Sequence, residues 1–477
     1  MNWSWPYIVL FVVTPLIVLG ILLWVYFFDG SDNGNHKKYQ VRLKLKNGKF
    51  KIKNLRRGIS IIGSAGSGKT ESVVYNLLQH FSEHNFCGII HDYKDFELTE
   101  MASPLFKGKD VKFHVIAFDK VHERVNPIAP RYLPNEESVN EVAKVLMENL
   151  LERNLSDNTG SSKFFSDAVE GLLAGLIWKM KTAYPQYCTL PHIIALYQTM
   201  PTKKLVAFLK SDYTSMAMAS AFLNGIESEK QTAGVKSTLA NAFKKISTKK
   251  LFYVLSKDEV PLDINNKKNK AIISIVNNPQ YEAVYSPVIA TIVHTIIKQM
   301  SVRNRESSFI LMEEAPTIKL PNMHRIPATL RSYDIATIYV MQDKIQNDMI
   351  YGDKASKAIL SNLSYQFFGK VNDPDTAKYY ERFFEIVKNT TRSVSKGVGL
   401  SWEARITKGE KEVPKRRAEI FFRLKQGEFI AFADGRDRKL LFKKLHIQDN
   451  NDFFYSKYSQ VQAKMNFKNI YEEILKI

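Results

Sequence analysis

Short apolar runs recur in two separate parts of the chain. In the first part they occupy residues 58–63, 87–93 and 111–118, with a helical segment after the first run. Runs of this length, bounded by turn residues, predict buried strands, and their alternation with helices favours a parallel α/β sheet. In the second part, further strands are predicted at residues 271–276, 308–312, 336–342, 365–371 and 429–433.

Between these two parts the apolar residues follow a helical period. The stretch AVEGLLAGLIWKM at 168–180 is densely apolar, and no alternating pattern interrupts residues 133–265. Intervals of three and four residues predict amphipathic helices, so we expect an all-α domain inserted into the α/β domain. Such intervals separate Val139, Val142, Ala143, Leu146 and Leu150.

Two local signals predict where particular elements turn or begin. Residues 39–55 alternate apolar and basic residues around Asn47-Gly48, which is typical of a β-hairpin with a type I′ turn and a basic exposed face. Ser286 and Pro287 are residue types of an N-cap and a first helical position, so we expect a helix to begin there.

The N-terminal segment differs from the rest of the chain. Residues 5–28 carry no charge and, at about 1.5 Å per residue, are long enough to cross a hydrocarbon core of roughly 30 Å. Basic residues follow this stretch and none precedes it. The sequence therefore predicts a single transmembrane helix with the bulk of the chain in the cytoplasm.

Taken together, the patterns divide the chain into five predicted parts. They are a membrane anchor and linker (1–36), a first half of a nucleotide-binding domain (37–132), the all-α insertion (133–265), the second half (266–448) and a C-terminal tail (449–477).

The net charge of the chain indicates the sign of its partner's charge. Lys plus Arg number 68 and Asp plus Glu 48, a formal charge of +20 that favours a polyanionic partner, either nucleic acid or an anionic membrane. Basic runs at 243–250, 267–270 and 414–417 could contact a DNA backbone or be solvated loops. Phe243 and Phe252, beside such runs, could stack on bases or belong to the core.

A glycine-rich motif follows the first predicted strand. Residues 63–70 read GSAGSGKT, which satisfies GxxxxGK[ST] between a strand and a helix. The backbone N–H groups of such a loop bind phosphate oxygens, the lysine reaches the β- and γ-phosphates, and the threonine binds Mg²⁺. The motif predicts a P-loop that binds ATP and Mg²⁺ and is formed by Gly63, Ser64, Ala65, Gly66, Ser67, Gly68, Lys69 and Thr70.

Two carboxylates follow the predicted strand at 308–312. A strand that ends in acidic residues is typical of a Walker B element, which holds the metal and activates the attacking water. Glu313 stands where an aspartate is usual, and Glu314 follows it. Paired glutamates at a strand end are also common as a solvated terminus, and the pair by itself leaves both readings open.

Five stretches in one order resemble a known family. GSAGSGKT, GIIHDYKDFEL, FILMEEAPTI, LRSYDIATIYVMQD and ILSNLSYQFFGKVNDPDTAKYY, with a helical insertion before the third, are similar to the TraG/TraD family of type IV secretion coupling proteins over about residues 40–445. The resemblance implies an α/β fold with a RecA-like P-loop NTPase core, an inserted all-α domain and an N-terminal transmembrane helix.

The resemblance also implies roles for single residues. Lys69 and Thr70 would bind the phosphates and Mg²⁺, Glu313 would serve the metal, and Glu314 would polarise the attacking water. Arg331 would be an arginine finger that reaches a neighbouring subunit, and Gln342 a sensor of the γ-phosphate. From its place between two strands, we expect Arg331 near the rim of the sheet that carries the nucleotide.

The implied function is ATP-driven pumping of relaxase-bound, single-stranded DNA into a secretion channel by a homo-hexamer in the bacterial inner membrane. Implied partners are DNA, relaxosome and channel proteins, and the membrane. Two alternatives stay open: a duplex DNA translocase of the FtsK/HerA type, and a receptor for protein substrates. The chain departs from the family in showing one predicted span, where two are common, and no extended C-terminal docking tail.

Overall fold

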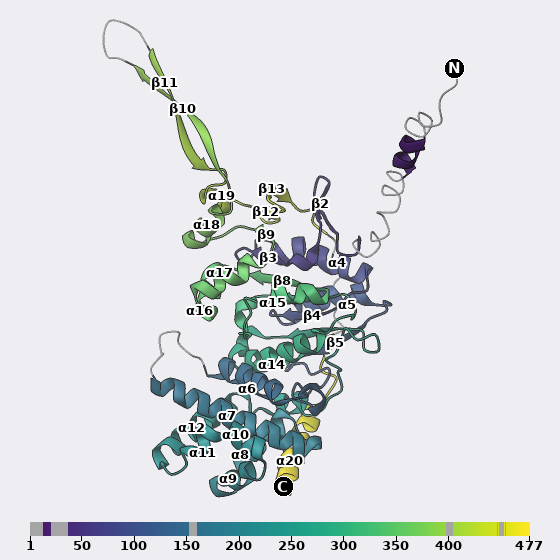
Figure 1. Cartoon of the computed structure of the whole chain (residues 1–477), viewed down its shortest axis with the longest axis vertical. Helices are drawn as coiled ribbons and strands as arrows, with labels where there is room; N and C mark the ends of the chain where they lie inside the picture. The colour runs from purple at the N-terminus through teal and green to yellow at the C-terminus, as the bar shows by residue number, and fades with distance from the viewer. Residues whose placement is uncertain are drawn as a thin grey trace.

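A computed structural model describes residues 13–20, 37–151, 160–396, 404–445, 447, 453 and 455–477 (Figure 1). The span predicted at residues 5–28 lies mostly outside these ranges. Within them, no helix combines the length and the apolarity needed to cross a bilayer.

A nine-stranded mixed sheet forms the centre of the described structure, in the order β13-β12-β9-β3-β8-β7-β4-β6-β5. Neighbours from β9 to β5 are parallel, and β12 pairs antiparallel with both β9 and β13. Each apolar run predicted as a strand overlaps one, and β13 was not predicted. The strands are β3 (Ile59–Ile62), β4 (Cys87–Asp92), β5 (Lys112–Ile116), β6 (Ala271–Val276), β7 (Ser308–Met312), β8 (Ile335–Met341), β9 (Tyr365–Phe368), β12 (Glu428–Ala433) and β13 (Arg436–Leu441).

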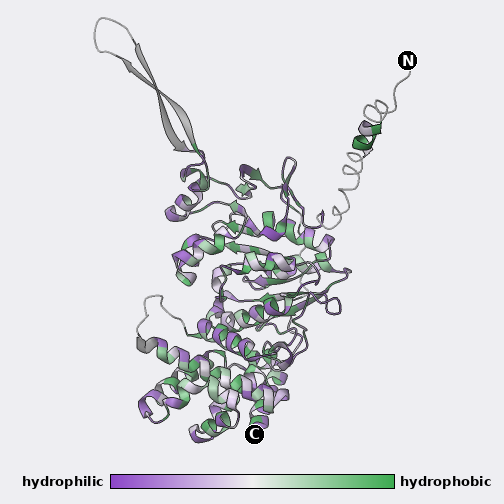
Figure 2. Cartoon of the chain, viewed as in Figure 1, coloured by the Kyte–Doolittle hydropathy of each residue, from purple (hydrophilic) through white to green (hydrophobic). Residues whose placement is uncertain are grey.

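Both faces of this sheet are covered. Ile61 belongs to a core shared with α4 (Tyr75–Glu83) and α5 (Glu97–Phe106), and the next residue, Ile62, belongs to the core on the other face, which includes α14 (Glu282–Met300). Because alternate side chains enter opposite cores, the inner strands are buried on both faces and mostly apolar (Figure 2).

The described residues between β5 and β6 form helices, as the sequence predicts, and they lie at the lower end of the molecule in Figure 1. Phe243 and Phe252 are buried in this region, so the alternative that they stack on bases is wrong. The helices are α6 (Glu136–Leu150), α7 (Gly160–Ala183), α8 (Leu190–Thr199), α9 (Thr202–Lys210), α10 (Tyr213–Met218), α11 (Ser220–Asn224), α12 (Glu229–Ile246) and α13 (Lys249–Leu255).

The C-terminal helix α20 (Gln460–Ile474) packs on these helices, although the sequence assigned residues 449–477 to a separate tail. His192 Nε2 lies 2.9 Å from Glu473 Oε2, and the rings of Phe252 and Phe467 are 4.8 Å apart between centroids. The last helix therefore completes the core of the helical region.

The predicted N-terminal hairpin is present, but its turn is not of type I′. β1 (Val41–Lys44) pairs antiparallel with β2 (Lys49–Ile52), and the exposed face carries basic residues, as expected. Gly48 has φ +83° while Asn47 keeps a negative φ, and a type I′ turn needs positive φ at both central residues. Residues 45–48 connect the two strands, and Leu45 N donates to Gly48 O. In this longer connection Asn47 does not need a positive φ.

The helix expected to begin at Ser286 begins earlier. α14 starts at Glu282, so Pro287 lies inside the helix and Ser286 is not its N-cap. The same pair of signals occurs upstream at Asn278 and Pro279, where the Asn278 side chain accepts from Gln280 N and opens a short 3₁₀ turn that leads into α14. The first signal along the chain set the start of the helix.

A second hairpin was not predicted. β10 (Ile386–Lys396) pairs antiparallel with β11 (Ala404–Pro414), and Figure 1 shows it extending away from the body of the molecule. The β-branched residues in these two segments were the available signal in the sequence.

Candidate nucleotide-binding site

The P-loop occupies the turn between β3 and the helix that continues into α4. Thr70 begins a π-helical turn (Thr70–Val74) that passes directly into α4. Gly66 and Gly68 have φ +74° and +87°, values that glycine adopts without strain. A Cβ on Gly68 would lie 3.0 Å from the backbone nitrogen of Gly427, so the close approach of that segment also requires glycine.

Two distant segments hold the P-loop in place. Ser64 N donates to Lys370 O at 2.7 Å, just after β9, and Gly427 N donates to Ser67 O at 3.0 Å, just before β12. These bonds fix the loop against the end of the parallel strand β9 on one side and against the antiparallel strand β12 on the other.

A cavity of about 160 Å³ lies over the loop. Of the residues that the sequence predicted for catalysis, Lys69, Glu314 and Gln342 line it, while Arg331 does not. Of the two predicted metal ligands, Thr70 lines it and Glu313 does not. Glu71, Glu97 and Gln426 also line the cavity, and the sequence did not predict them. Gln426 could not be predicted because only the pairing of β12 brings it to the cavity. The full lining is Ala65, Gly66, Ser67, Gly68, Lys69, Thr70, Glu71, Lys94, Glu97, Glu314, Gln342 and Gln426.

Lys69 is buried at the rim of this cavity. Its Nζ donates to the carbonyl of Gly63 at 2.6 Å and to that of Ser64 at 3.4 Å. Burial lowers the pKa of the ammonium, and the charge of Glu314 opposes that shift. The carbonyls of the loop thus hold the Lys69 ammonium beside the cavity, where it can bind anionic phosphate oxygens.

The two glutamates after β7 point to different partners. Glu314 has φ +43°, a left-handed conformation that is costly for a residue other than glycine and is common at functional sites. Its Oε1 accepts a hydrogen bond of 3.1 Å from Nε2 of Gln342, at the end of β8. The neighbouring strands β7 and β8 therefore deliver a carboxylate and its amide partner to the same cavity.

Glu313 is buried beneath the cavity. Its Oε1 lies 3.0 Å from Lys94 Nζ, and its Oε2 accepts from Tyr93 N at 3.3 Å. Burial, together with the charge of Asp92, raises the pKa of Glu313 to about 7. Because Lys94 already forms an ion pair with this carboxylate, the arrangement does not support the expected contact between Glu313 and a metal.

Asp92 supports the turn that carries Lys94. Its carboxylate accepts hydrogen bonds from Lys94 N and from both the backbone and the hydroxyl of Thr99, at 3.2, 2.8 and 2.6 Å. Burial raises the pKa of Asp92 to about 6. Asp92 thus anchors the start of α5 and positions the 93–97 segment over the cavity.

Arg331 is not at the rim where we expected it. It is exposed and lies just before β8, whereas Gln342 follows the end of that strand. At about 3.3 Å per residue, β8 separates the two by roughly 20 Å. Asp334, the residue directly before β8, pairs with Arg56, which lies just before β3. Both residues therefore mark the edge of the sheet opposite the cavity. A residue that precedes a parallel strand lies at the edge away from the nucleotide, so Arg331 cannot reach its own P-loop.

Each predicted basic run contains a side chain paired with an acid. Lys250 lies 3.3 Å from Asp119, Lys270 pairs with Asp110, and Arg416 lies 3.0 Å from Asp437. Contact of these runs with DNA stays a prediction.

A family model described as "Type IV secretory system Conjugative DNA transfer" matches residues 28–411. No curated protein sequence matches the chain.

Similar solved structures share the fold. The bacterial conjugative coupling protein TrwBdeltaN70, unbound, is 12% identical with a TM-score of 0.68, over 87% of this chain and 91% of that one. Plasmid coupling protein TrwB with ADP and Mg²⁺ is 13% identical with a TM-score of 0.64, over 84% and 89%. VirB4 of Thermoanaerobacter pseudethanolicus is 13% identical with a TM-score of 0.51, over 85% and 96%.

Proposed function

Because this chain belongs to the type IV secretory system conjugative DNA transfer family and is a coupling protein of type IV secretion, we propose that it hydrolyses ATP to move relaxase-bound DNA into the secretion channel. The observation that carries the proposal is the shared cavity of Lys69, Glu314 and Gln342 over the P-loop. The core is RecA-like in this proposal, with β8 between the P-loop strand β3 and the strand β7 that ends in the glutamates.

The cofactors we propose are ATP and Mg²⁺. TrwB has been solved with a non-hydrolysable ATP analogue and with ADP and Mg²⁺. In this chain the loop glycines, the Lys69 ammonium and the Thr70 hydroxyl line one cavity, which is the donor set that a magnesium nucleotide needs. Thr70 would hold the Mg²⁺, which neutralises charge on the phosphates when bound.

The chain's own residues then divide the catalytic work. Backbone N–H groups of the P-loop and Lys69 bind and orient the phosphates. Glu314 takes the proton of the attacking water, and Gln342 holds the Glu314 carboxylate in position through its amide. Glu313 is buried and pairs with the partly exposed Lys94, which lines the cavity, so this pair supports the ends of the strands.

The assembly we propose is a homo-hexameric ring, anchored in the bacterial inner membrane by residues 5–28 with its bulk in the cytoplasm. Exposed Arg331, at the edge of the sheet away from its own P-loop, suits an arginine finger supplied to a neighbouring subunit. Single-stranded DNA, relaxosome proteins and channel proteins are the proposed partners.

The test compares Lys69→Ala with Lys378→Ala, an exposed lysine on α18 (Pro374–Glu381). Lys69→Ala should abolish DNA-stimulated ATP turnover and conjugative transfer while the protein still folds, and Lys378→Ala should leave both intact. Transfer by Lys69→Ala at the wild-type frequency would refute the motor. Stimulation by duplex DNA alone would favour the FtsK/HerA type, and turnover without any DNA stimulation would favour a protein-substrate receptor.

A further inference from the structure

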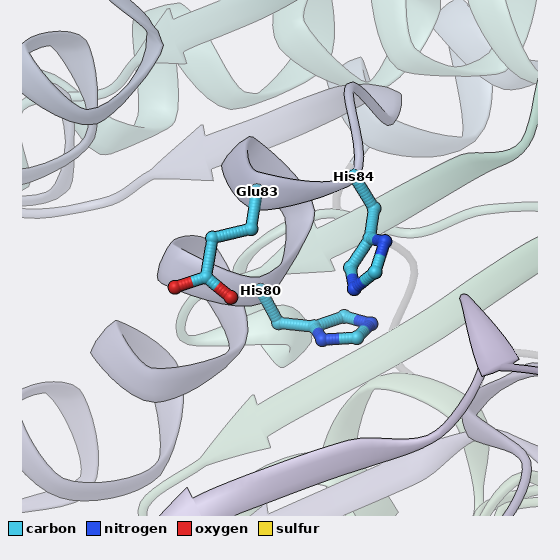
Figure 3. Close-up of side chains that lie close together, drawn as sticks. All are labelled: His80, Glu83 and His84. Atoms are coloured by element: carbon cyan, nitrogen blue, oxygen red, sulfur yellow. The ribbon is translucent and has the colours of Figure 1, made fainter.

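Three side chains of metal-binding types lie together at the end of α4, far from the P-loop. His80 and Glu83 are three residues apart in the last turn of the helix, and His84 is its C-cap. One ligand atom of each lies within 4.8 Å of the others (Figure 3). Among the described residues, this is the group of histidine, cysteine and acidic side chains with the geometry of a metal site.

The orientation of His80 is fixed by the backbone. His80 is buried, and its Nε2 lies 2.7 Å from the carbonyl oxygen of Lys38. A carbonyl can only accept, so Nε2 carries the proton and the lone pair of the neutral ring is on Nδ1. A histidine that donates one ring N–H to a backbone carbonyl and offers the other nitrogen is the usual arrangement of a metal ligand.

We propose that His80 Nδ1, His84 and the Glu83 carboxylate bind a divalent transition-metal ion of the zinc class. Two imidazoles and one carboxylate suit zinc, whereas Mg²⁺ and Ca²⁺ prefer a shell of oxygen ligands. Three protein ligands leave one position open for solvent. The C-terminal end of a helix also favours a cation, because its unpaired carbonyls carry partial negative charge.

The surroundings decide what fills the open position. All three side chains line a cavity of about 320 Å³ together with Lys37, Arg42 and Lys44. These basic groups oppose a bare cation and attract an anion. Hydroxide or another small anion on the metal therefore balances the charge, with Glu83 supplying one negative charge from the protein.

The site is separate from the nucleotide site, because the helix runs about 20 Å from Thr70 to Glu83. Its effect is local. A metal on His80 would hold the ring that bonds to Lys38 and so fasten the end of α4 to the chain segment that enters the domain before β1. The inference does not depend on the proposed motor function.

The test uses the full-length, tag-free protein, stripped of metal and held in millimolar Mg²⁺ so that oxygen-ligand sites are filled. Zn²⁺ titration by calorimetry should show one site, and Co²⁺ should give the visible absorption of a nitrogen-ligated site. His84→Ala and Glu83→Gln, both exposed, should each weaken Zn²⁺ binding by at least about tenfold. The controls are Gln79→Ala, in the same cavity, and His324→Ala, outside it; both should bind as wild type does.

Two results would overturn the proposal. One is wild-type affinity for Zn²⁺ in His84→Ala, which would place the ion elsewhere. The other is the failure of the wild-type protein to bind Zn²⁺ at a concentration of about 100 µM. A Zn²⁺-dependent rise in melting temperature in the wild type, lost in His84→Ala and kept in His324→Ala, would support it by a readout that needs no ATP turnover.

Discussion

Gln342 donates a hydrogen bond of 3.1 Å from its Nε2 to Oε1 of Glu314. The two residues are at the ends of neighbouring parallel strands, β8 and β7, and both line the cavity over the P-loop. The bond holds a carboxylate whose backbone is already in a left-handed conformation, with φ +43°. We therefore propose that Gln342 acts on catalysis through Glu314, by holding its carboxylate in position.

Gln342→Ala should lower kcat for ATP hydrolysis by about 10- to 100-fold, because Glu314 loses the partner that orients it. The affinity for ATP should change little, since binding rests on the P-loop. Steady-state kinetics and nucleotide titration would measure both. The control is Gln346→Ala, an exposed glutamine on α16 (Lys344–Tyr351). A Gln342→Ala variant with wild-type kcat would exclude the positioning role.

Glu314→Gln should bind ATP but hydrolyse it about 10²- to 10⁴-fold more slowly, because an amide cannot take a proton from water. Glu313→Gln should be the milder change, because Glu313 faces Lys94 and does not line the cavity. Single-turnover hydrolysis with both variants makes the comparison. If Glu313→Gln is the slower enzyme, the roles of the two glutamates are reversed.

Glu313 also predicts a pH dependence of stability. Burial, then the charge of Asp92, raises the pKa of Glu313 from 4.5 to about 7. The folded protein therefore holds this proton more tightly than the unfolded chain does, and the associated stability is present below about pH 4.5 and lost as the pH rises to about 7.

Glu313→Gln removes that titration. Relative to the wild type, the free energy of unfolding of the variant should rise by at least about 1 kcal/mol between about pH 5 and about pH 8. The ion pair with Lys94 is already included in this shift, because Lys94 opposes the rise in the pKa of Glu313 and pairs only with the ionised carboxylate. Urea denaturation at several pH values gives the difference, and a difference that does not vary with pH would contradict the assignment.

Arg331→Ala should lower DNA-stimulated hydrolysis by about 10³- to 10⁵-fold with little change in ATP affinity, if the guanidinium stabilises charge on a neighbour's γ-phosphate. Arg325→Ala, an exposed arginine nearby, is the matched control. Rings mixed from Arg331→Ala and Lys69→Ala subunits should recover a fraction of the activity, because some interfaces pair an intact P-loop with an intact arginine.

Full activity of Arg331→Ala alone would remove the finger assignment. Because Arg331 lies about 20 Å from the cavity edge of its own sheet, action within its own subunit is already excluded by geometry. Mixed rings that recover no activity would count against exchange between neighbours.

Much of the α/β core was predictable because its signals are local. Strands buried on both faces are mostly apolar along their whole length, so runs such as 271–276 and 308–312 were found with the bounds that the structure has. The P-loop was equally accessible, since its glycines, lysine and threonine are consecutive and their chemistry depends on a single turn between a strand and a helix.

Local signals gave wrong predictions of a helix start and of a turn type. Ser286-Pro287 resembles a helix start, but Asn278-Pro279 opened the turn into the same helix eight residues earlier. Asn47-Gly48 predicted the hairpin correctly and its turn type wrongly, because the length of the connection is set by how the strands pair and not by the dipeptide.

What the sequence by itself determined is the order of strands and helices, the P-loop and the pair of glutamates. Only the tertiary structure decided which glutamate faces the cavity, that Gln426 reaches it, and that Arg331 stands at the far edge of the sheet. The physical reason is that these properties depend on strand order. β8 lies between β3 and β7, and the pairing of distant strands is fixed by the packing of the whole sheet, which no single stretch of sequence encodes.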